Sequence, residues 1–325
     1  MTALVPGPDG ARPAFQHQAL LYGSDDEFTS LLVPFVQEGL RSGDHVVAVT
    51  TPAHIGLLRA ELRGDAEEVR FIDACTWFQG PVGALAEYDR YLAEHAANGR
   101  VRLIGEAVWP ESSPLSGEWP RYEAVMNVAF AAAAAWIVCP YDTRMAPPDL
   151  VSDARRTHPE LALGAGPERS SDYLAPLDFH RRADVLELRP APAAAGWTDF
   201  GRDGLRAVRG RVAAEAEAAG LRAERVAHLV CAVNEVATNA VQHGGGAGAL
   251  RTWVEEADPE RGARRGSLVC EVASHGEFTA QFPGYLPPSR DTTSGRGLWL
   301  VRQLCDRVDI RSYAGRSVVR MTMLS

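Results

Sequence analysis

A carboxylate and two asparagines lie close together in the segment Asn234-Glu-Val-Ala-Thr-Asn-Ala-Val-Gln-His-Gly244. Glu235 and Asn239 are four residues apart, so on a helix they share one face. A carboxylate can act as a base or polarise water, and an amide oxygen can coordinate Mg²⁺. Gly295 and Gly297 precede an apolar helical pattern, and such a helix start offers free N–H groups to an anion. Together these residues predict a nucleotide site without a P-loop.

Composition excludes several classes of protein. The 33 basic residues are all arginine, whereas P-loop NTPases, eukaryotic-type protein kinases, SxxK acyl enzymes and Schiff-base enzymes require a lysine. The five cysteines form no CxxC pair, so we expect neither a zinc site nor a disulfide framework. We expect them instead to be buried small hydrophobic residues.

Length and charge divide the chain. Its 325 residues suggest two domains. Residues 1–196 carry a net charge of −11 and residues 197–325 carry +2. A net acidic chain without a basic run is a poor nucleic-acid binder. We find no apolar run long enough to span a membrane and no signal-peptide pattern, and therefore expect a cytoplasmic protein with no membrane partner.

The elements that must position these residues differ between the halves. In residues 15–180, short apolar strands alternate with helical patterns, which predicts a doubly wound α/β domain with a parallel sheet covered on both faces. We expect a linker at residues 181–196, around a Pro- and Ala-rich stretch, and independent folding of residues 197–325. The expected strands and helices of the first half are 19–22, 25–39, 45–50, 52–63, 69–72, 84–98, 101–104, 119–135 and 136–139.

Polar and aromatic residues follow the expected strands of the first half. Ligands of such folds bind beyond the C-terminal ends of the strands, although each residue singly also suits a cap or a turn. No nucleophile–base pair stands out, which argues against a metabolic enzyme. The candidates for a sensory site are Tyr22, Ser24, Thr50, His54, Asp73, Glu106, Trp109, Tyr141 and Asp142.

Several ordered motifs give the first half a resemblance to a known family. They are His17–Phe28, Phe35–Leu40 with Gly43-Asp44, Gly105–Trp109, Trp119–Glu123, Cys139–Asp142 and Thr157–Pro159. Residues 15–175 resemble the MEDS sensory domain of methanogen and methylotroph sensors. The resemblance implies a RecA-like core without a working P-loop, in agreement with the missing lysine, and an unidentified small-molecule signal.

The second half resembles the GHKL (Bergerat) ATPase fold, closely its anti-sigma regulatory branch. Asn234–Gly244 matches the N-box, Gly295–Val301 the second glycine box, and Gln303–Met323 the closing helix and hairpin. The resemblance implies an α+β sandwich, with Glu235 as general base, Asn239 as the Mg²⁺ ligand and residues 277–294 as the ATP lid. It further implies nucleotide contacts from His243, Ser274, Gly276, Gly295, Arg296, Gly297 and Leu298.

This branch consists of serine kinases that bind sigma factors and phosphorylate STAS-type antagonists. We therefore expect a sensory regulator that binds a sigma factor, its STAS-type antagonist or both, with ATP and Mg²⁺ as cofactors and a homodimer as a further assembly to test. The alternative is a pseudokinase that only binds partners. A sensor histidine kinase is disfavoured, since none of the nine histidines precedes an acidic residue.

One position departs from the GHKL pattern. The family carries an Asp-x-Gly motif whose Asp accepts a hydrogen bond from the adenine amino group. Gly276 fits the glycine, which places Ser274 where the Asp should be. Because a serine hydroxyl is an uncharged acceptor, we expect weak ATP binding, poor discrimination against GTP, and slow or absent kinase activity.

Overall fold

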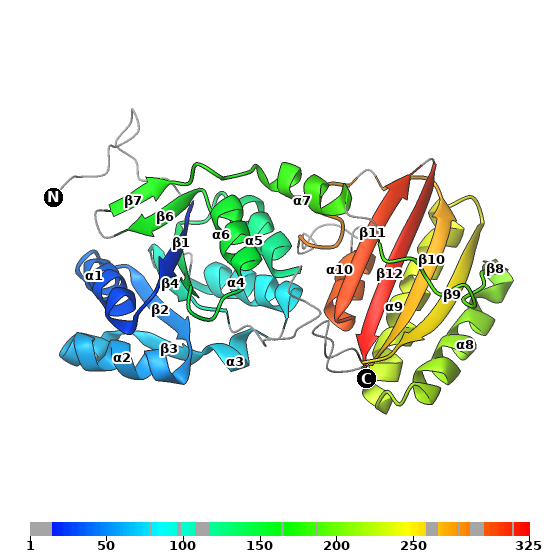
Figure 1. The fold of residues 1–325 in the computed structure, drawn as a ribbon, viewed down its shortest axis with the longest axis horizontal. Coiled ribbons are helices and arrows are strands. Elements are labelled where there is room, and N and C mark those ends of the chain that lie inside the picture. The colour runs from blue at the N-terminus through cyan, green and yellow to red at the C-terminus, as the bar shows by residue number, and fades with distance from the viewer. Residues whose placement is uncertain are drawn as a thin grey trace. The chain divides into compact units, whose positions relative to one another are not determined.

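The computed structural model divides into two compact units. The first contains the described residues from Phe15 to His180 except Glu118, and the second contains Glu118 and the described residues from Arg181 to Ser325 (Figure 1). None of the described helices is long and apolar enough to cross a membrane. The structure describes residues 15–78, 80–95, 99–107, 118–163, 166–185, 188–257, 266–278, 280–286, 296–313 and 315–325.

A parallel sheet forms the centre of the first unit. Its strand order is β3-β2-β4-β5-β1-β6-β7, and every neighbouring pair is parallel except the antiparallel hairpin of β6 and β7. The predicted parallel α/β arrangement is therefore present, whereas the edge hairpin was not predicted. The strands are β1 (Phe15–Tyr22), β2 (His45–Thr50), β3 (Arg70–Asp73), β4 (Val101–Gly105), β5 (Ala135–Asp142), β6 (Glu160–Leu163) and β7 (Gly166–Arg169).

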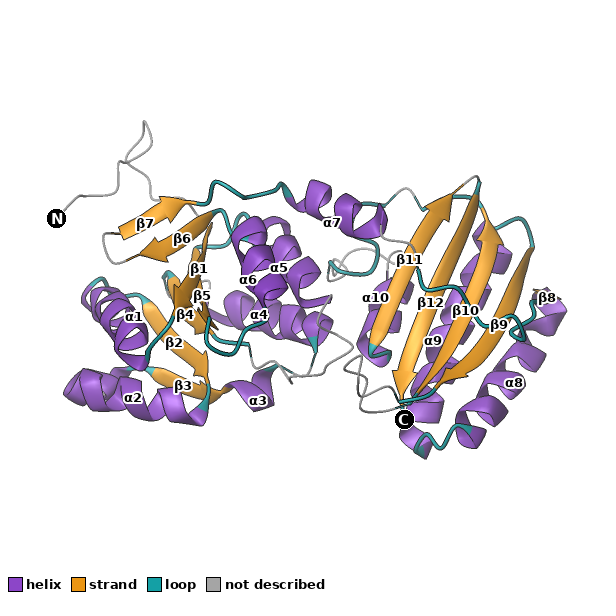
Figure 2. Cartoon of the chain, viewed as in Figure 1, coloured by secondary structure: helices purple, strands orange, loops and turns teal. Residues whose placement is uncertain are grey.

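Helices cover both faces of this sheet (Figure 2). Helices α1 and α2 pack on one face, where Phe28, Leu32 and Leu58 join the buried side chains of β1 and β2. Helices α4, α5 and α6 lie on the opposite face. The helices are α1 (Asp25–Arg41), α2 (Pro52–Leu62), the 3₁₀ turn η1 (Arg63–Glu68), α3 (Ala74–Trp77), α4 (Pro81–His95), α5 (Glu118–Ala129), α6 (Pro148–Thr157) and α7 (Pro176–Val185).

The expectation that a helix continues to residue 135 is wrong. Helix α5 ends at Ala129, and Ala135 already begins β5. Phe130, the first residue of the turn between them, is 3% exposed. The high helix propensity of the alanine run is overridden by packing, because the chain must reverse here to place the apolar strand in the sheet.

A buried arginine joins α1 to the sheet. Arg102 on β4 is completely buried, and its Nε donates to Asp44 Oδ2 at 2.6 Å. Its guanidinium lies 4.6 Å from the ring centre of Trp136. A β-carbon at Gly39 would lie 2.7 Å from Arg102 Cδ and 2.9 Å from Val46 Cγ2. A glycine at position 39 is therefore what lets the helix approach this side chain.

Gly39→Ala is expected to destabilise the first unit. The bonds of Arg102 hold its stem in place, so overpacking costs about 1–3 kcal/mol and exceeds the helix-propensity gain of about 0.5–1 kcal/mol. Gly56→Ala in α2 is the matched control, because no atom lies within 4 Å of its added methyl group. Native-state hydrogen exchange of β4 amides measures both. Equal stabilisation by the two substitutions would contradict the close contact.

The second unit is an antiparallel sheet with helices on one face (Figure 2). Val212, Leu229, Cys270 and Met321 belong to one core between the sheet and helices α8, α9 and α10. The strand order is β11-β12-β10-β9-β8. The elements are β8 (Thr198–Gly201), the 3₁₀ turn η3 (Arg202–Gly204), α8 (Leu205–Ala218), α9 (Ala223–His243), β9 (Ala247–Glu255), β10 (Ser267–His275), α10 (Arg296–Leu304), β11 (Arg307–Tyr313) and β12 (Arg316–Leu324).

The face of this sheet away from the helices carries a buried ion network. Glu271 is 1% exposed and accepts hydrogen bonds from Arg251 and Arg320. The guanidinium of Arg251 lies 4.3 Å from the ring centre of Trp197. This contact holds Trp197, which directly precedes β8, against the sheet.

Candidate functional site

The acid and the amide of the predicted nucleotide site lie beside the start of α10. A β-carbon at Gly297 would lie 3.2 Å from Glu235 Oε2 and 3.4 Å from Asn239 Nδ2. The two side chains come from α9, and Gly297 is the second residue of α10. The structure thus brings together three residues that are up to 62 positions apart in the sequence.

Apolar packing explains this arrangement. Helix α9 buries Leu229, Val233 and Val236 against the sheet, which leaves Glu235 and Asn239 on a partly exposed face. Helix α10 buries Val301 and so docks beside α9. Its N-terminal N–H groups favour an anion, while a carboxylate and an amide oxygen suit a metal ion and a water.

The other residues predicted for the nucleotide site on α9 and α10 differ in how exposed they are. Arg296 is exposed at the first position of α10, and Leu298 packs partly against the core. His243 is exposed at the last position of α9. Gly295 lies outside the described residues, so its predicted role stays a prediction.

The position expected to contact adenine carries no carboxylate. Ser274 Oγ lies 2.9 Å from Ser317 Oγ on the neighbouring strand, and one hydroxyl donates to the other. Gly276 has a φ of +92°, and its N–H donates to the carbonyl of Gly315 at 2.9 Å. A β-carbon at Gly244 would lie 2.8 Å from Ser274 Cβ, so the end of α9 packs directly on this strand.

The segment expected to form the ATP lid is described only in part. A β-carbon at Gly284 would lie 2.6 Å from the carbonyl oxygen of Leu298, and Arg302 Nε donates to the carbonyl of Pro283 at 2.9 Å. This portion of the segment therefore packs on α10. Residues 279 and 287–295 are outside the described residues.

In the first unit, a second group of predicted residues converges on Glu106. Tyr22 Oη donates to Glu106 Oε1 at 2.7 Å, and His54 Nδ1 lies 2.7 Å from Glu106 Oε2. Thr50 Oγ1 also donates to Oε2. Tyr22 and Thr50 end β1 and β2, and Glu106 directly follows β4, so the C-terminal ends of three strands contribute. The geometry suits a small polar ligand at this edge.

Electrostatics favour an ion pair in this cluster. Burial opposes ionisation of Glu106, but hydrogen bonds with His54 and Thr50 outweigh it and lower the pKa of the carboxyl group. Burial likewise opposes protonation of His54, yet its bond with Glu106 raises the pKa of the imidazole. Burial and the Glu106 charge raise the pKa of Tyr22 far above its usual value. A hydrogen bond from Arg144 lowers the pKa of Asp142.

The remaining predicted sensory residues lie elsewhere. Ser24 caps α1 by accepting from the N–H of Glu27, and Asp73 accepts from the N–H of Cys75 at the start of α3. The ring of Tyr141 is buried beside His158, with centroids 5.7 Å apart. Trp109 is outside the described residues.

The His54–Glu106 pair makes stability depend on pH. Because the His54 pKa is raised from 6.5, its contribution is present below pH 6.5 and is lost as pH rises through the higher folded-state pKa. Because the Glu106 pKa is lowered from 4.5, its contribution is present above pH 4.5 and is lost at lower pH. We expect the free-energy difference between the natural protein and His54→Gln to be largest between these values.

Denaturant unfolding at several pH values measures that difference. His243→Gln, at an exposed position in the other unit, is the control substitution. A stability difference for His54→Gln that stays constant from about pH 5 to pH 9 would contradict the ion pair.

The cysteine expectation is partly wrong. Cys139, Cys270 and Cys305 are buried as expected, but Cys75 and Cys231 are exposed. The exposure of Cys231 follows from its position on α9. It lies on the outer face of the helix, away from the stripe of buried apolar residues. Burial raises the pKa of the thiols of Cys270 and Cys305.

Two family models match the chain. Residues 16–159 match the MEthanogen/methylotroph, DcmR Sensory domain, abbreviated MEDS. Residues 202–323 match the histidine kinase-like ATPase domain. The protein therefore has the two-domain architecture of a MEDS sensory domain followed by a GHKL-like ATPase domain. No curated protein matches the chain. The architecture is that of a regulatory, ATPase-like protein with a sensory domain.

Proposed function

We propose that this protein is an anti-sigma regulatory factor whose ATPase-like domain binds a sigma factor or its STAS-type antagonist. The observation that carries the proposal is the juxtaposition of Glu235 and Asn239 with Gly297 at the start of α10. The resemblance to the anti-sigma branch supports the proposal, since it implies a general base at Glu235, a Mg²⁺ ligand at Asn239 and close approach of the phosphates at Gly297.

Each residue has a chemical part in this proposal. The Asn239 amide oxygen would hold Mg²⁺, and the N–H groups at the start of α10 would hold the phosphates of ATP. Glu235 accepts the proton of the attacking serine or threonine hydroxyl of the antagonist. Gly297 leaves the phosphates space that a side chain would occupy.

The sensory input enters at the Glu106 cluster of the MEDS domain. A ligand that hydrogen-bonds Tyr22 or His54 would compete with Glu106 for these side chains. Binding would then replace their bonds to Glu106 with bonds to the ligand. Polar small molecules are the ligand class that this chemistry favours. The protein would then work in the cytoplasm as a signal-responsive switch on transcription.

Phosphoryl transfer tests the enzymatic part of the proposal. The full chain is mixed with a STAS-type protein from the same genome and γ-labelled ATP with Mg²⁺. We expect slow labelling of the STAS protein, reduced at least about tenfold in Glu235→Gln because a general base contributes 10²–10⁴-fold. Glu217→Gln, an acid on α8, is the matched control. Labelling that is unchanged in Glu235→Gln would contradict the assigned role.

A second candidate is a pseudokinase that binds partners without phosphoryl transfer. The pairing of Ser274 with Ser317 favours it, because the adenine end then offers only uncharged acceptors. Sigma-factor binding that is independent of ATP, together with no labelling of any STAS protein, would support this candidate over the kinase.

A further inference from the structure

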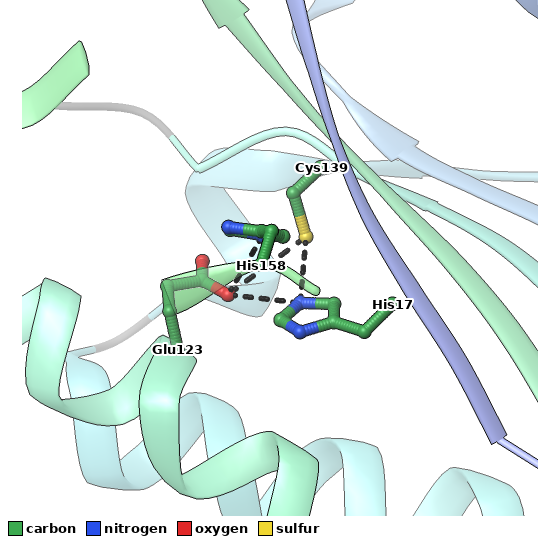
Figure 3. A group of neighbouring side chains, drawn as sticks. All are labelled: His17, Glu123, Cys139 and His158. Carbon is green, nitrogen blue, oxygen red and sulfur yellow. Dashed lines mark hydrogen bonds and ion pairs between the residues drawn. The ribbon is translucent and has the colours of Figure 1, made fainter. Parts of the chain in front are cut away.

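Four potential metal ligands meet on the face of the MEDS sheet opposite the Glu106 cluster. They are His17, Glu123, Cys139 and His158, and each is at most 4% exposed (Figure 3). Their ligand atoms all lie within 4.8 Å of one another. The residues come from β1, α5, β5 and the residue after α6, so tertiary structure alone brings them together.

Strand register places two of the ligands. His17 lies beside Ile137 in the parallel pairing of β1 with β5, and Cys139 is two residues beyond Ile137. Because side chains alternate between faces along a strand, His17 and Cys139 point to the same face. Helix α5 lies over that face and presents Glu123 from below, as Figure 3 shows.

Four of the six separations between the ligand atoms lie close to those around one tetrahedral ion, and all six are at most 4.8 Å, so a small inward movement of the side chains would close the site. Glu123 Oε2 lies 3.2 Å from His17 Nε2 and 3.6 Å from His158 Nε2. Cys139 Sγ lies 3.5 Å from His17 Nε2 and 3.9 Å from Glu123 Oε2. Ligands bound at about 2.0–2.3 Å around a tetrahedral Zn²⁺ lie roughly 3.3–3.6 Å from one another.

Hydrogen bonds on the far side of each ring orient the two imidazoles. His158 Nδ1 lies 2.8 Å from the carbonyl oxygen of Ala154, which can only accept, so Nδ1 carries the proton. His17 Nδ1 lies 3.1 Å from Asn127 Oδ1. The Asn127 amide nitrogen donates to the carbonyl of Thr157 at 2.8 Å, which fixes its oxygen toward His17. Both Nε2 lone pairs therefore face the cluster, as metal-ligating histidines require.

A proton alone does not satisfy this cluster. Protonation of His17 would account for its 3.2 Å contact with Glu123. It would leave His158 Nε2 buried with no hydrogen-bond partner among the described residues. A buried nitrogen without a hydrogen-bond partner is unfavourable, because it has lost its bonds to water and gained none. A single cation bound to both Nε2 atoms, the carboxylate and the sulfur satisfies all four groups at once.

We propose that His17, Glu123, Cys139 and His158 bind one divalent transition-metal ion, with Zn²⁺ as the best fit. Two imidazoles, a thiolate and a carboxylate in tetrahedral arrangement are the donor set and geometry that zinc takes. Four protein ligands leave no open position, so the ion is structural and not catalytic. Because the ligands are buried, the ion enters during folding and exchanges slowly with solvent.

Metal analysis of the purified full chain tests the proposal. We expect about one ion per chain after dialysis against a chelator in the native state. Unfolding in denaturant with chelator should release the ion. Refolding with Co²⁺ in place of Zn²⁺ should produce the absorption of a thiolate bound to tetrahedral cobalt.

Cys139→Ser is expected to abolish the thiolate–cobalt band, whereas Cys305→Ser, which removes a buried thiol from the other domain, should keep it. His158→Gln should lower the cobalt affinity at least about tenfold. Should a variant fail to fold, the natural protein still decides the question. Natural protein that refolds with native circular dichroism in chelator, and takes up neither Zn²⁺ nor Co²⁺ at stoichiometric concentration, would overturn the proposal.

Discussion

Replacement of Asp44 by alanine is expected to lower the free energy of unfolding of the MEDS domain by about 3–5 kcal/mol. The substitution removes the carboxylate 2.6 Å from Arg102 Nε and leaves a fully buried guanidinium without that partner. The bond from Arg102 Nη1 to the carbonyl of Phe35, at 3.0 Å, remains but carries no compensating charge.

Glu38→Ala provides the matched control. Glu38 lies 3.6 Å from the same guanidinium, but its side chain is 49% exposed. Removal of an exposed partner should cost less than about 1 kcal/mol. Hydrogen exchange of the β2 and β4 amides measures the MEDS domain separately from the rest of the chain. Equal losses for the two variants would show that the burial of Asp44 does not decide the effect.

A double substitution separates the lost pairing from the lost packing. Arg102→Met in the Asp44→Ala background removes the unpaired charge while an apolar side chain remains against Trp136. Since apolar replacement of a whole buried ion pair is often neutral, the double variant should regain most of the stability. A double variant less stable than Asp44→Ala would mean that the hydrogen bonds of Arg102 matter more than its charge.

The sequence predicted the elements well where packing follows a regular period. Apolar runs such as His45–Thr50 form buried parallel strands, and the helical stripe of α9 is buried as its spacing indicates. The β6–β7 hairpin has no such signal, because its strands contain four residues each and the edge strand includes Pro167. The run of alanines after α5 gave a wrong helix prediction for a different reason. Alanine has a high helix propensity, but the chain must reverse there to enter β5.

The two candidate sites differ in how much of them the sequence contains. Glu235 and Asn239 lie one helical turn apart, so their shared face was predictable from spacing alone. Their contact with Gly297 depends on the docking of α10 and became expected only through the resemblance. Within the MEDS domain, the rule that ligands bind at strand ends selected Tyr22 and Glu106, which the structure brings into contact. It could not separate them from Asp73, which has the same kind of position and serves as a helix cap.

The proposed metal ligands were beyond the reach of sequence spacing. His17 and His158 are 141 residues apart, and no two of the four ligands lie on one element. All four stand within the motifs that carry the MEDS resemblance, which was the available signal. In those motifs, Asp44 and Gly39 also have a role, because they accommodate the buried Arg102. The motifs therefore contain both residues that stabilise the domain and residues that could bind a ligand. The sequence does not distinguish the two kinds, whereas the structure does.

Ser274→Asp is expected to tighten ATP binding roughly 5- to 150-fold, which corresponds to about 1–3 kcal/mol. In the natural protein, Ser274 and Ser317 hydrogen-bond each other, and neither offers a charged acceptor. An aspartate at position 274 would accept from the Ser317 hydroxyl through one oxygen and present the other to the adenine amino group. The same bond would disfavour GTP, whose base carries a carbonyl oxygen at that position.

Calorimetry with ATP and GTP on the natural protein and two variants decides this prediction. Ser274→Asn is the control, because its amide oxygen has nearly the same reach without a charge, and charge-assisted bonds are roughly twice as strong. We expect weak binding with little preference between ATP and GTP for the natural protein, a small gain for Ser274→Asn, and a large adenine-selective gain for Ser274→Asp. Tight and adenine-selective binding by the natural protein would show that the site recognises adenine without a carboxylate. Because Glu235, Asn239 and Gly297 are unchanged in all three proteins, a difference among them reports on the adenine end of the site.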